Sequence, residues 1–195
     1  MQAKFAPAQA VWILLEPGLA LQGQLAAREL TRGLRSLGLV REPIQAPLPG
    51  ARPAAADFVF TLTVTQDTFK HPEAYQIAQE AQAGRPSRVR LTGATPLALV
   101  YAVFDFLERQ GAFFGLDGEV YPLEPARALN LPPVNQPWRA EPRFAVRGLV
   151  PWPDFLNCIT AFNREDLRAY LEAMLRMRFN TLGIHVYSGA KQWAE

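Results

Sequence analysis

The spacing of apolar and polar residues predicts an alternation of short strands and amphipathic helices from the start of the chain. Val11 to Leu15 is a short apolar run, cut off by Pro17 and Gly18, which is typical of a buried strand. From Leu19 to Leu37 apolar residues recur at helical spacing, with arginine and glutamate between them, and Gly38 supplies a stop signal. This pattern predicts a helix that packs one face on a sheet.

More strand signals follow a proline-rich connection. Glu42 to Ala56 is rich in proline and alanine, so we expect it to be exposed and without regular structure. Phe58 to Val64 is β-branched and aromatic, which favours a strand. Glu73 to Gln79 and Ser87 to Leu91 are two further strand candidates, and the turn-forming residues between them predict a hairpin.

A second helix is signalled by its cap. Thr95 is the expected N-cap, Pro96 occupies the first helical position, and Gly111 ends the helix. Its apolar stripe, made of Leu97, Val100, Tyr101, Phe104 and Leu107, is most simply core packing.

A proline-rich stretch follows, and it predicts a domain boundary that separates residues 1–137 from residues 138–195.

The segment from Phe144 to Glu195 has the pattern of one strand, one helix and the start of a second strand. Asn163 is the expected N-cap of a helix that runs to Arg178, with Asp166 completing a variant of the capping box. The buried face is predicted to contain Leu167, Tyr170, Leu171, Met174 and Leu175. The second strand is predicted from Asn180 to Tyr187. Such a unit cannot bury both faces of its sheet alone, so we expect the chain to be the front part of a larger protein.

Composition narrows the class of protein. The 49% hydrophobic and 19% charged content is that of a globular protein, and the net charge of +2 is nearly balanced. Because the basic residues are scattered, no nucleic-acid partner is predicted. Cys158 is the single cysteine, so an internal disulfide and a cysteine-based metal cluster are excluded, and a small buried apolar role is expected.

The predicted location follows from two absences in the sequence. No apolar run approaches the roughly 20 residues that a membrane span needs, so no membrane partner is predicted. Glu16 and Pro17 interrupt the apolar run near the start, which therefore falls short of a secretory signal. A cytoplasmic location is the default expectation, with a secreted or periplasmic location left open.

Two groups of motifs carry a resemblance to known enzymes. In residues 73–114 one strand ends in an E-x-Y-x-I pattern, the next ends in glycine, and the helix carries Y-x-x-x-x-x-L; residues 142–148 read P-R-F-x-x-R-G. The residues concerned are Glu73, Tyr75, Ile77, Gly93, Tyr101, Leu107, Pro142, Arg143, Phe144, Arg147 and Gly148. This succession resembles the accessory N-terminal domain of glycoside hydrolases of family 20 (β-N-acetylhexosaminidases), family 67 (α-glucuronidases) and family 115.

The resemblance implies a particular α/β fold. In those families a small zincin-like α/β sandwich, a mixed sheet with helices on one face, precedes a TIM barrel. We therefore expect this sandwich in residues 1–137, followed in residues 138–195 by the first strand–helix–strand of an incomplete (β/α)8 barrel. Zinc proteases of zincin shape need two histidines one helical turn apart, whereas His71 and His185 are far apart. No metal site and no cofactor are predicted.

The resemblance also indicates two candidates for substrate binding around the first barrel strand. Arg147, expected near the carboxyl end of that strand, matches an arginine that binds sugar hydroxyls in family 20, and its planar fork of donors suits the task. The alternative is an arginine paired with a carboxylate at the domain junction. Trp152 resembles the tryptophan of the R-x-x-x-x-W pattern of family 67 and would stack on a sugar ring. The alternative is a wedge that packs the domain interface.

Two more candidates lie in the loop after Trp152 and on the second strand. Asp154 would accept a sugar hydroxyl, or is an ordinary loop aspartate. Asn180 and His185 match an N-x-x-x-x-H spacing on the second strand in family 20, so His185 is a substrate-side candidate or a hydrogen-bonded core histidine. Residues 188–191 differ from the Asp-Asp-Gln run of that family, so hexosaminidase specificity does not follow.

No catalytic residue is predicted in this chain. Cleavage of a glycosidic bond generally needs two positioned carboxyl groups, or one together with a substrate acetamido group, and in the resembling families these lie on later strands. The first hypothesis is therefore an N-terminal fragment of a glycoside hydrolase that acts on a carbohydrate and is inactive alone. The second is a non-catalytic carbohydrate-binding or scaffold module, and the third is a complete α/β interaction domain. An unfinished barrel surface is expected to self-associate.

Overall fold

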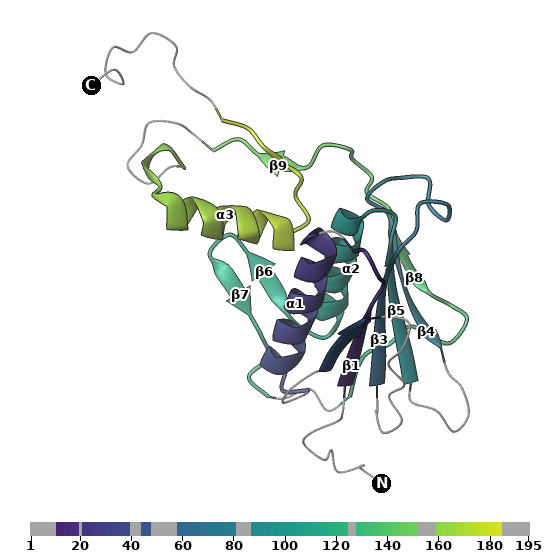
Figure 1. Cartoon of the computed structure of the whole chain (residues 1–195). Helices are drawn as coiled ribbons and strands as arrows, with labels where there is room; N and C mark the ends of the chain where they lie inside the picture. The colour runs from purple at the N-terminus through teal and green to yellow at the C-terminus, as the bar shows by residue number, and fades with distance from the viewer. Residues whose placement is uncertain are drawn as a thin grey trace, which may run out of the picture. The chain divides into compact units, whose positions relative to one another are not determined.

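The computed structural model of the chain describes residues 11–19, 21–39, 44–47, 58–80, 87–124, 128–151 and 159–184, with the backbone alone at 44–47. Within these ranges the chain has an α/β fold (Figure 1). It divides into two compact units, which are described one after the other. The first unit is Met1–Phe114 with Glu119–Arg143, and the second unit is Gly115–Gly118 with Phe144–Glu195.

A mixed sheet of six strands forms the centre of the first unit. In spatial order the strands are β2 (Ile44–Pro47), β1 (Val11–Leu15), β3 (Phe58–Val64), β5 (Ser87–Gly93), β4 (Tyr75–Glu80) and β8 (Trp138–Ala140). The first four run parallel, whereas β4 is antiparallel to both β5 and β8. The strands predicted at β1 and β3 are confirmed with their predicted bounds, and the predicted hairpin is confirmed as β4 and β5.

Two helices, α1 (Leu21–Ser36) and α2 (Pro96–Arg109), cover one face of this sheet and pack against each other (Figure 1). The covered face is formed by the fully buried side chains of Ile13, Phe60, Leu62, Ile77, Val89 and Leu91. The ring of Phe60 meets Phe106 of α2 edge-on, with the centroids 5.4 Å apart. Gly33 allows the helices to approach closely, because a β-carbon there would overlap the side chain of Leu107. The predicted mixed sheet with helices on one face is confirmed.

The second helix begins and ends as its sequence signals predict. The Thr95 hydroxyl accepts a hydrogen bond from the Ala98 N–H at 3.2 Å and donates one to the Pro72 carbonyl at 2.8 Å. Pro96 takes the first helical position, where its missing N–H costs nothing. After the helix ends, Gly111 adopts a φ of 102°, a conformation that favours glycine.

The two edge strands lie where the sequence predicts irregular chain. Strand β2 falls inside Glu42 to Ala56 and pairs in parallel with β1, so the prediction of no regular structure was wrong at Ile44–Pro47. A proline is tolerated there because an edge strand has unpaired N–H positions. Strand β8 also follows prolines, and the Arg109 guanidinium lies 4.3 Å from the centroid of its Trp138 ring.

The proline-rich segment after α2 belongs to the first unit. The Gln110 side chain donates to the Asn130 carbonyl at 3.0 Å and accepts from the Asn130 N–H at 2.7 Å. Strand β8 then joins the sheet, so the units divide after Arg143, later than the predicted boundary between residues 137 and 138. The assignment of the two parts as accessory domain and barrel stays a prediction.

The second unit contains β9 (Gly148–Leu149), the 3-10 turn η1 (Ile159–Ala161), α3 (Arg164–Arg176) and β10 (Thr181–Leu182). Strands β9 and β10 pair in parallel, which is the strand–helix–strand order that the sequence predicts. In α3 only Ala173 and Met174 are buried, and Leu171 is 44% exposed. The predicted buried face was therefore wrong at Leu171, because the described strand pair covers little of the helix.

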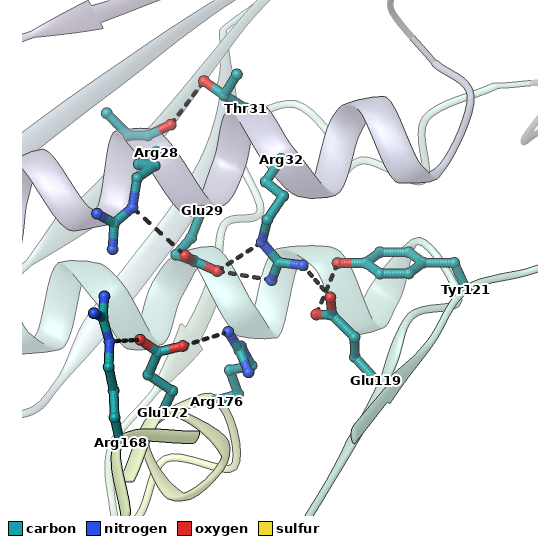
Figure 2. A network of polar contacts seen from close by, with 10 residues as sticks. Arg28, Glu29, Thr31, Arg32, Glu119, Tyr121, Arg168, Glu172 and Arg176 are labelled. Atoms are coloured by element: carbon teal, nitrogen blue, oxygen red, sulfur yellow. Dashed lines mark hydrogen bonds and ion pairs between the residues drawn. The ribbon is translucent and has the colours of Figure 1, made fainter. Parts of the chain in front are cut away.

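An ionic network links α1 to the short hairpin of β6 (Phe113–Gly115) and β7 (Gly118–Val120) through Glu119, a residue of the first unit (Figure 2). The Arg32 guanidinium donates to the buried Glu29 carboxylate at 2.7 Å and to the Glu119 carboxylate. Burial lowers the pKa of Arg32, but the hydrogen bonds to Glu119 and Glu29 outweigh it and raise that pKa above its ordinary value. Burial also raises the pKa of the neighbouring Tyr121 phenol, to about 12.

We expect Arg32→Ala to lower the free energy of unfolding by about 2 kcal/mol, because it leaves the buried Glu29 carboxylate without its main cation. This loss is smaller than that expected for a fully buried ion pair, because the Arg32 side chain is 33% exposed. Urea unfolding followed by circular dichroism measures the change. Arg28→Ala is the matched control, because Arg28 is 67% exposed and 3.9 Å from Glu29. Equal losses in both variants would contradict this account.

Candidate functional site

Of the four predicted substrate-binding residues, Arg147 lies within the described part of the chain, in the second unit. It immediately precedes β9, so it stands at the amino end of that strand and not near the carboxyl end as expected. Its backbone carbonyl accepts hydrogen bonds from the N–H groups of Asn180 and Thr181, at 2.8 and 3.1 Å. Arg147 therefore makes backbone hydrogen bonds that join the start of β9 to the segment before β10.

The Arg147 guanidinium donates hydrogen bonds to two backbone carbonyls. Its Nε donates to the carbonyl of Arg178 at 3.0 Å, and its Nη1 donates to the carbonyl of Phe144 at 2.8 Å. Arg178 follows the end of α3 and has a φ of 62°, in the left-handed region. The half-buried side chain thus ties the turn that precedes β9 to the chain that leaves α3.

Asn180 completes the same cluster from the other strand. Its side-chain oxygen accepts from the Arg147 N–H at 3.0 Å, and its side-chain nitrogen donates to the Ala145 carbonyl at 2.8 Å. Gly148 is required beside it, because a β-carbon at that position would overlap the Thr181 carbonyl. The sequence motif that pairs Arg147 with Gly148 therefore has a local purpose: it lets β9 and β10 approach.

Helix α3 has its predicted cap and a charged surface. The Asn163 side chain accepts from the Asp166 N–H at 2.9 Å, and the Asp166 carboxylate accepts from the Asn163 N–H at 3.2 Å, which confirms the capping box. Glu172 accepts from Arg168 at 3.0 Å and from Arg176 at 3.2 Å (Figure 2). The carboxylates of Asp166 and Glu172 therefore stabilise α3.

The remaining predicted site residues, Trp152, Asp154 and His185, lie outside the described residues, as does Cys158. Their roles, and the sugar-binding role of Arg147, stay predictions. Among the described residues, no group of three or more histidine, cysteine, aspartate or glutamate side chains is gathered that could hold a metal ion. No helix in the same ranges is long and apolar enough to cross a bilayer.

The structure also brings together residues that the sequence analysis did not single out as a site. A cavity of about 250 Å³ lies in the first unit, where the segment after β3 meets the beginning of β4 and the end of β8. Its lining includes Thr68, Phe69, Lys70, Tyr75, Arg139 and Glu141. These residues come from two segments that are distant in the sequence, so no local motif could reveal the cavity.

Comparison with known proteins gives a likeness of fold. No family model matches the sequence, and no curated protein matches it. Among solved structures, the chain is similar to a glycoside hydrolase described as a GH138 enzyme targeting pectin rhamnogalacturonan II, with a TM-score of 0.58 and 16% sequence identity. The match covers 89% of this chain and 24% of that chain. This chain therefore has a glycoside hydrolase-like α/β fold and spans about a quarter of the enzyme that it matches.

We expect Asn180→Ala to speed amide hydrogen exchange in residues 144–149 about tenfold, because two hydrogen bonds that hold the start of β9 are lost. Exchange followed by mass spectrometry measures the effect segment by segment. As a control, Asn163→Ala removes the cap of α3 and should speed exchange only in the first turn of that helix. Unchanged exchange at residues 144–149 in Asn180→Ala would show that Asn180 does not organise the strand pair.

Proposed function

We propose that this chain is a non-catalytic part of a carbohydrate-active glycoside hydrolase, an enzyme that hydrolyses O-glycosidic bonds. The observation that carries the proposal is the likeness to a glycoside hydrolase over 89% of the chain. A match of that extent includes residues of both units. The proposal does not depend on any single motif.

The strand pair of the second unit supports a place in a larger sheet. Parallel sheets are found with both faces covered and with more than two strands, because each open edge exposes unpaired backbone groups. The described part of this sheet consists of β9 and β10, and several apolar side chains of the unit are exposed. These are Phe144, Val146, Val150, Leu171 and Ile184. Further strands of a (β/α)8 barrel would cover them, and without those strands we expect the isolated chain to self-associate.

The acidic residues of the second unit support a non-catalytic role for this part of the enzyme. Among its described helix and strand residues the carboxylates are Glu165, Asp166 and Glu172, all on α3. Asp166 accepts from the N-cap backbone, and Glu172 is paired with arginines. Barrel enzymes carry their catalytic groups at the carboxyl ends of strands, so the acid pair that glycoside cleavage requires is proposed to lie on other strands of the barrel.

Substrate contacts are the finer part of the proposal. Trp152 is proposed to stack on a sugar ring, and Arg147, Asp154 and His185 are proposed to bind its hydroxyl groups. A substrate of the glucuronidase type, as in family 67, is favoured over a hexosaminidase substrate because residues 188–191 depart from the family 20 pattern. The matched enzyme targets pectin rhamnogalacturonan II, so pectic oligosaccharides belong among the test substrates.

A non-catalytic carbohydrate-binding or scaffold module is the alternative. The first unit supports this alternative, because its sheet, with α1 and α2 on one face, has a buried core of its own. The two functions differ in one property, because only the first places a carboxylate pair elsewhere in the same protein.

The decisive experiment compares two proteins: the 195-residue chain alone and the full product of the reading frame that contains it. Both are assayed on nitrophenyl glycosides, including the glucuronide, and on pectic oligosaccharides. We expect hydrolysis by the full product and none by the chain alone. Trp152→Ala in the full product should raise KM, whereas Arg147→Ala should also lower stability because it frees two carbonyls. Turnover by the chain alone, or inactivity of the full product on all glycosides, would contradict the proposal.

A further inference from the structure

The cavity of the first unit lies at one corner of the six-stranded sheet. Tyr75 begins β4 and is paired with Ala140, the last residue of β8, the edge strand. The segment Thr68 to Lys70, which follows β3, also lines the cavity. The volume of about 250 Å³ is slightly below the roughly 300–1,000 Å³ of pockets for drug-sized molecules, so it suits a ligand with a single ring.

Two cationic side chains that line this cavity have N–H donors that the described part of the chain does not use. Lys70 is exposed and makes no hydrogen bond or ion pair with any part of the chain that the structure describes. Arg139 is exposed, and its Nε donates to the Gln76 side chain at 2.9 Å, which fixes the direction of the guanidinium. Within those same ranges neither cation is paired with a carboxylate. A guanidinium and an ammonium on one cavity favour an anion, and a carboxylate suits the guanidinium fork.

The rest of the lining is not that of a simple anion site. Phe69 contributes aromatic surface, on which the C–H face of a sugar ring packs well, whereas Tyr75 lines the cavity as a buried residue. Glu141 also lines the cavity, and its carboxylate would repel a bare anion but would accept hydrogen bonds from hydroxyl groups. Thr68 adds a hydroxyl that both donates and accepts. A ligand with one carboxylate and several hydroxyls on an apolar ring matches all of these groups.

Polar groups continue from the cavity along the face of the sheet that is opposite to α1 and α2. Arg139 is in register with Gln76, Gln76 with Thr92, and Thr92 with Thr63. The two threonine hydroxyls are hydrogen bonded to each other at 3.1 Å. Thr92 is buried, so Arg139 and Gln76 are the members of this row that could contact a further sugar unit of an oligosaccharide.

We propose that this cavity binds an acidic sugar, a hexuronate. Lys70 and Arg139 hold the carboxylate, Phe69 faces the ring, and Glu141 accepts from a hydroxyl group. The inference rests on the first unit alone and does not require the proposed hydrolase activity. It would give the protein a non-catalytic contact with acidic polysaccharides, separate from Arg147 and the other residues considered in the second unit.

The test is a titration of the 195-residue chain with D-galacturonate, followed by isothermal calorimetry and by chemical shifts in 15N-labelled protein. D-galactose and acetate are titrated in parallel, because they supply the ring without the carboxylate and the carboxylate without the ring. We expect galacturonate to bind with at least tenfold higher affinity than either and to shift the amide signals of residues 68–70 and 139–141. Arg139→Ala should weaken galacturonate binding at least tenfold, and Lys70→Ala at least threefold.

Arg90→Ala is the matched control, because Arg90 lies on the same sheet but is paired with Glu80 at 2.7 Å and does not line the cavity. Its affinity for galacturonate should equal that of the parent protein. Lys70→Ala is not expected to disturb the fold, because Lys70 has no polar contact in the described ranges that its removal would break. A loss of binding in this variant therefore reports on the cavity. Equal binding of galactose or acetate, no binding of galacturonate, or unchanged affinity in Lys70→Ala would each overturn the proposal, whatever the outcome of the hydrolase assay.

Discussion

The edges of a β-sheet carry backbone N–H and C=O groups that need partners, and this constraint governs both units. In the first unit the edge strands β2 and β8 are short, and they enclose four strands that are paired on both sides. In the second unit β9 and β10 pair only with each other within the described residues. The first unit therefore pairs four of its strands on both sides within the chain, whereas neither described strand of the second unit is paired on both sides.

The parts of the fold that could be predicted are those with long, regular patterns. Helices α1 and α2 were foreseeable from apolar spacing and from the Thr95 cap, and β3 from its β-branched residues. The edge strands β2 and β8 were not, because three or four residues carry too little alternation and their prolines indicate loops. Their positions are set by the neighbouring strands β1 and β4, a tertiary effect that local sequence does not contain.

The sequence identified residue types for a site but could not assign their contacts. Arg147 was foreseen as a donor, yet one carbonyl that its guanidinium meets belongs to Arg178, a residue with left-handed backbone thirty-one positions away. The cavity in the first unit was missed for a related reason. Lys70 and Arg139 belong to unrelated segments and approach only because β8 pairs with β4. Exposed charges of this kind look like ordinary solvated residues in a sequence.

The central claim, that β9 and β10 belong to a larger sheet, is tested most directly by amide exchange at Gly183. Its N–H donates to the Leu149 carbonyl at 2.8 Å and so reports on the strand pair. In the isolated chain we predict exchange that is orders of magnitude faster at Gly183 than at the core amides of β3, and strong protection in the full product of the reading frame. Protection of Gly183 equal to that of β3 in the isolated chain would contradict the account.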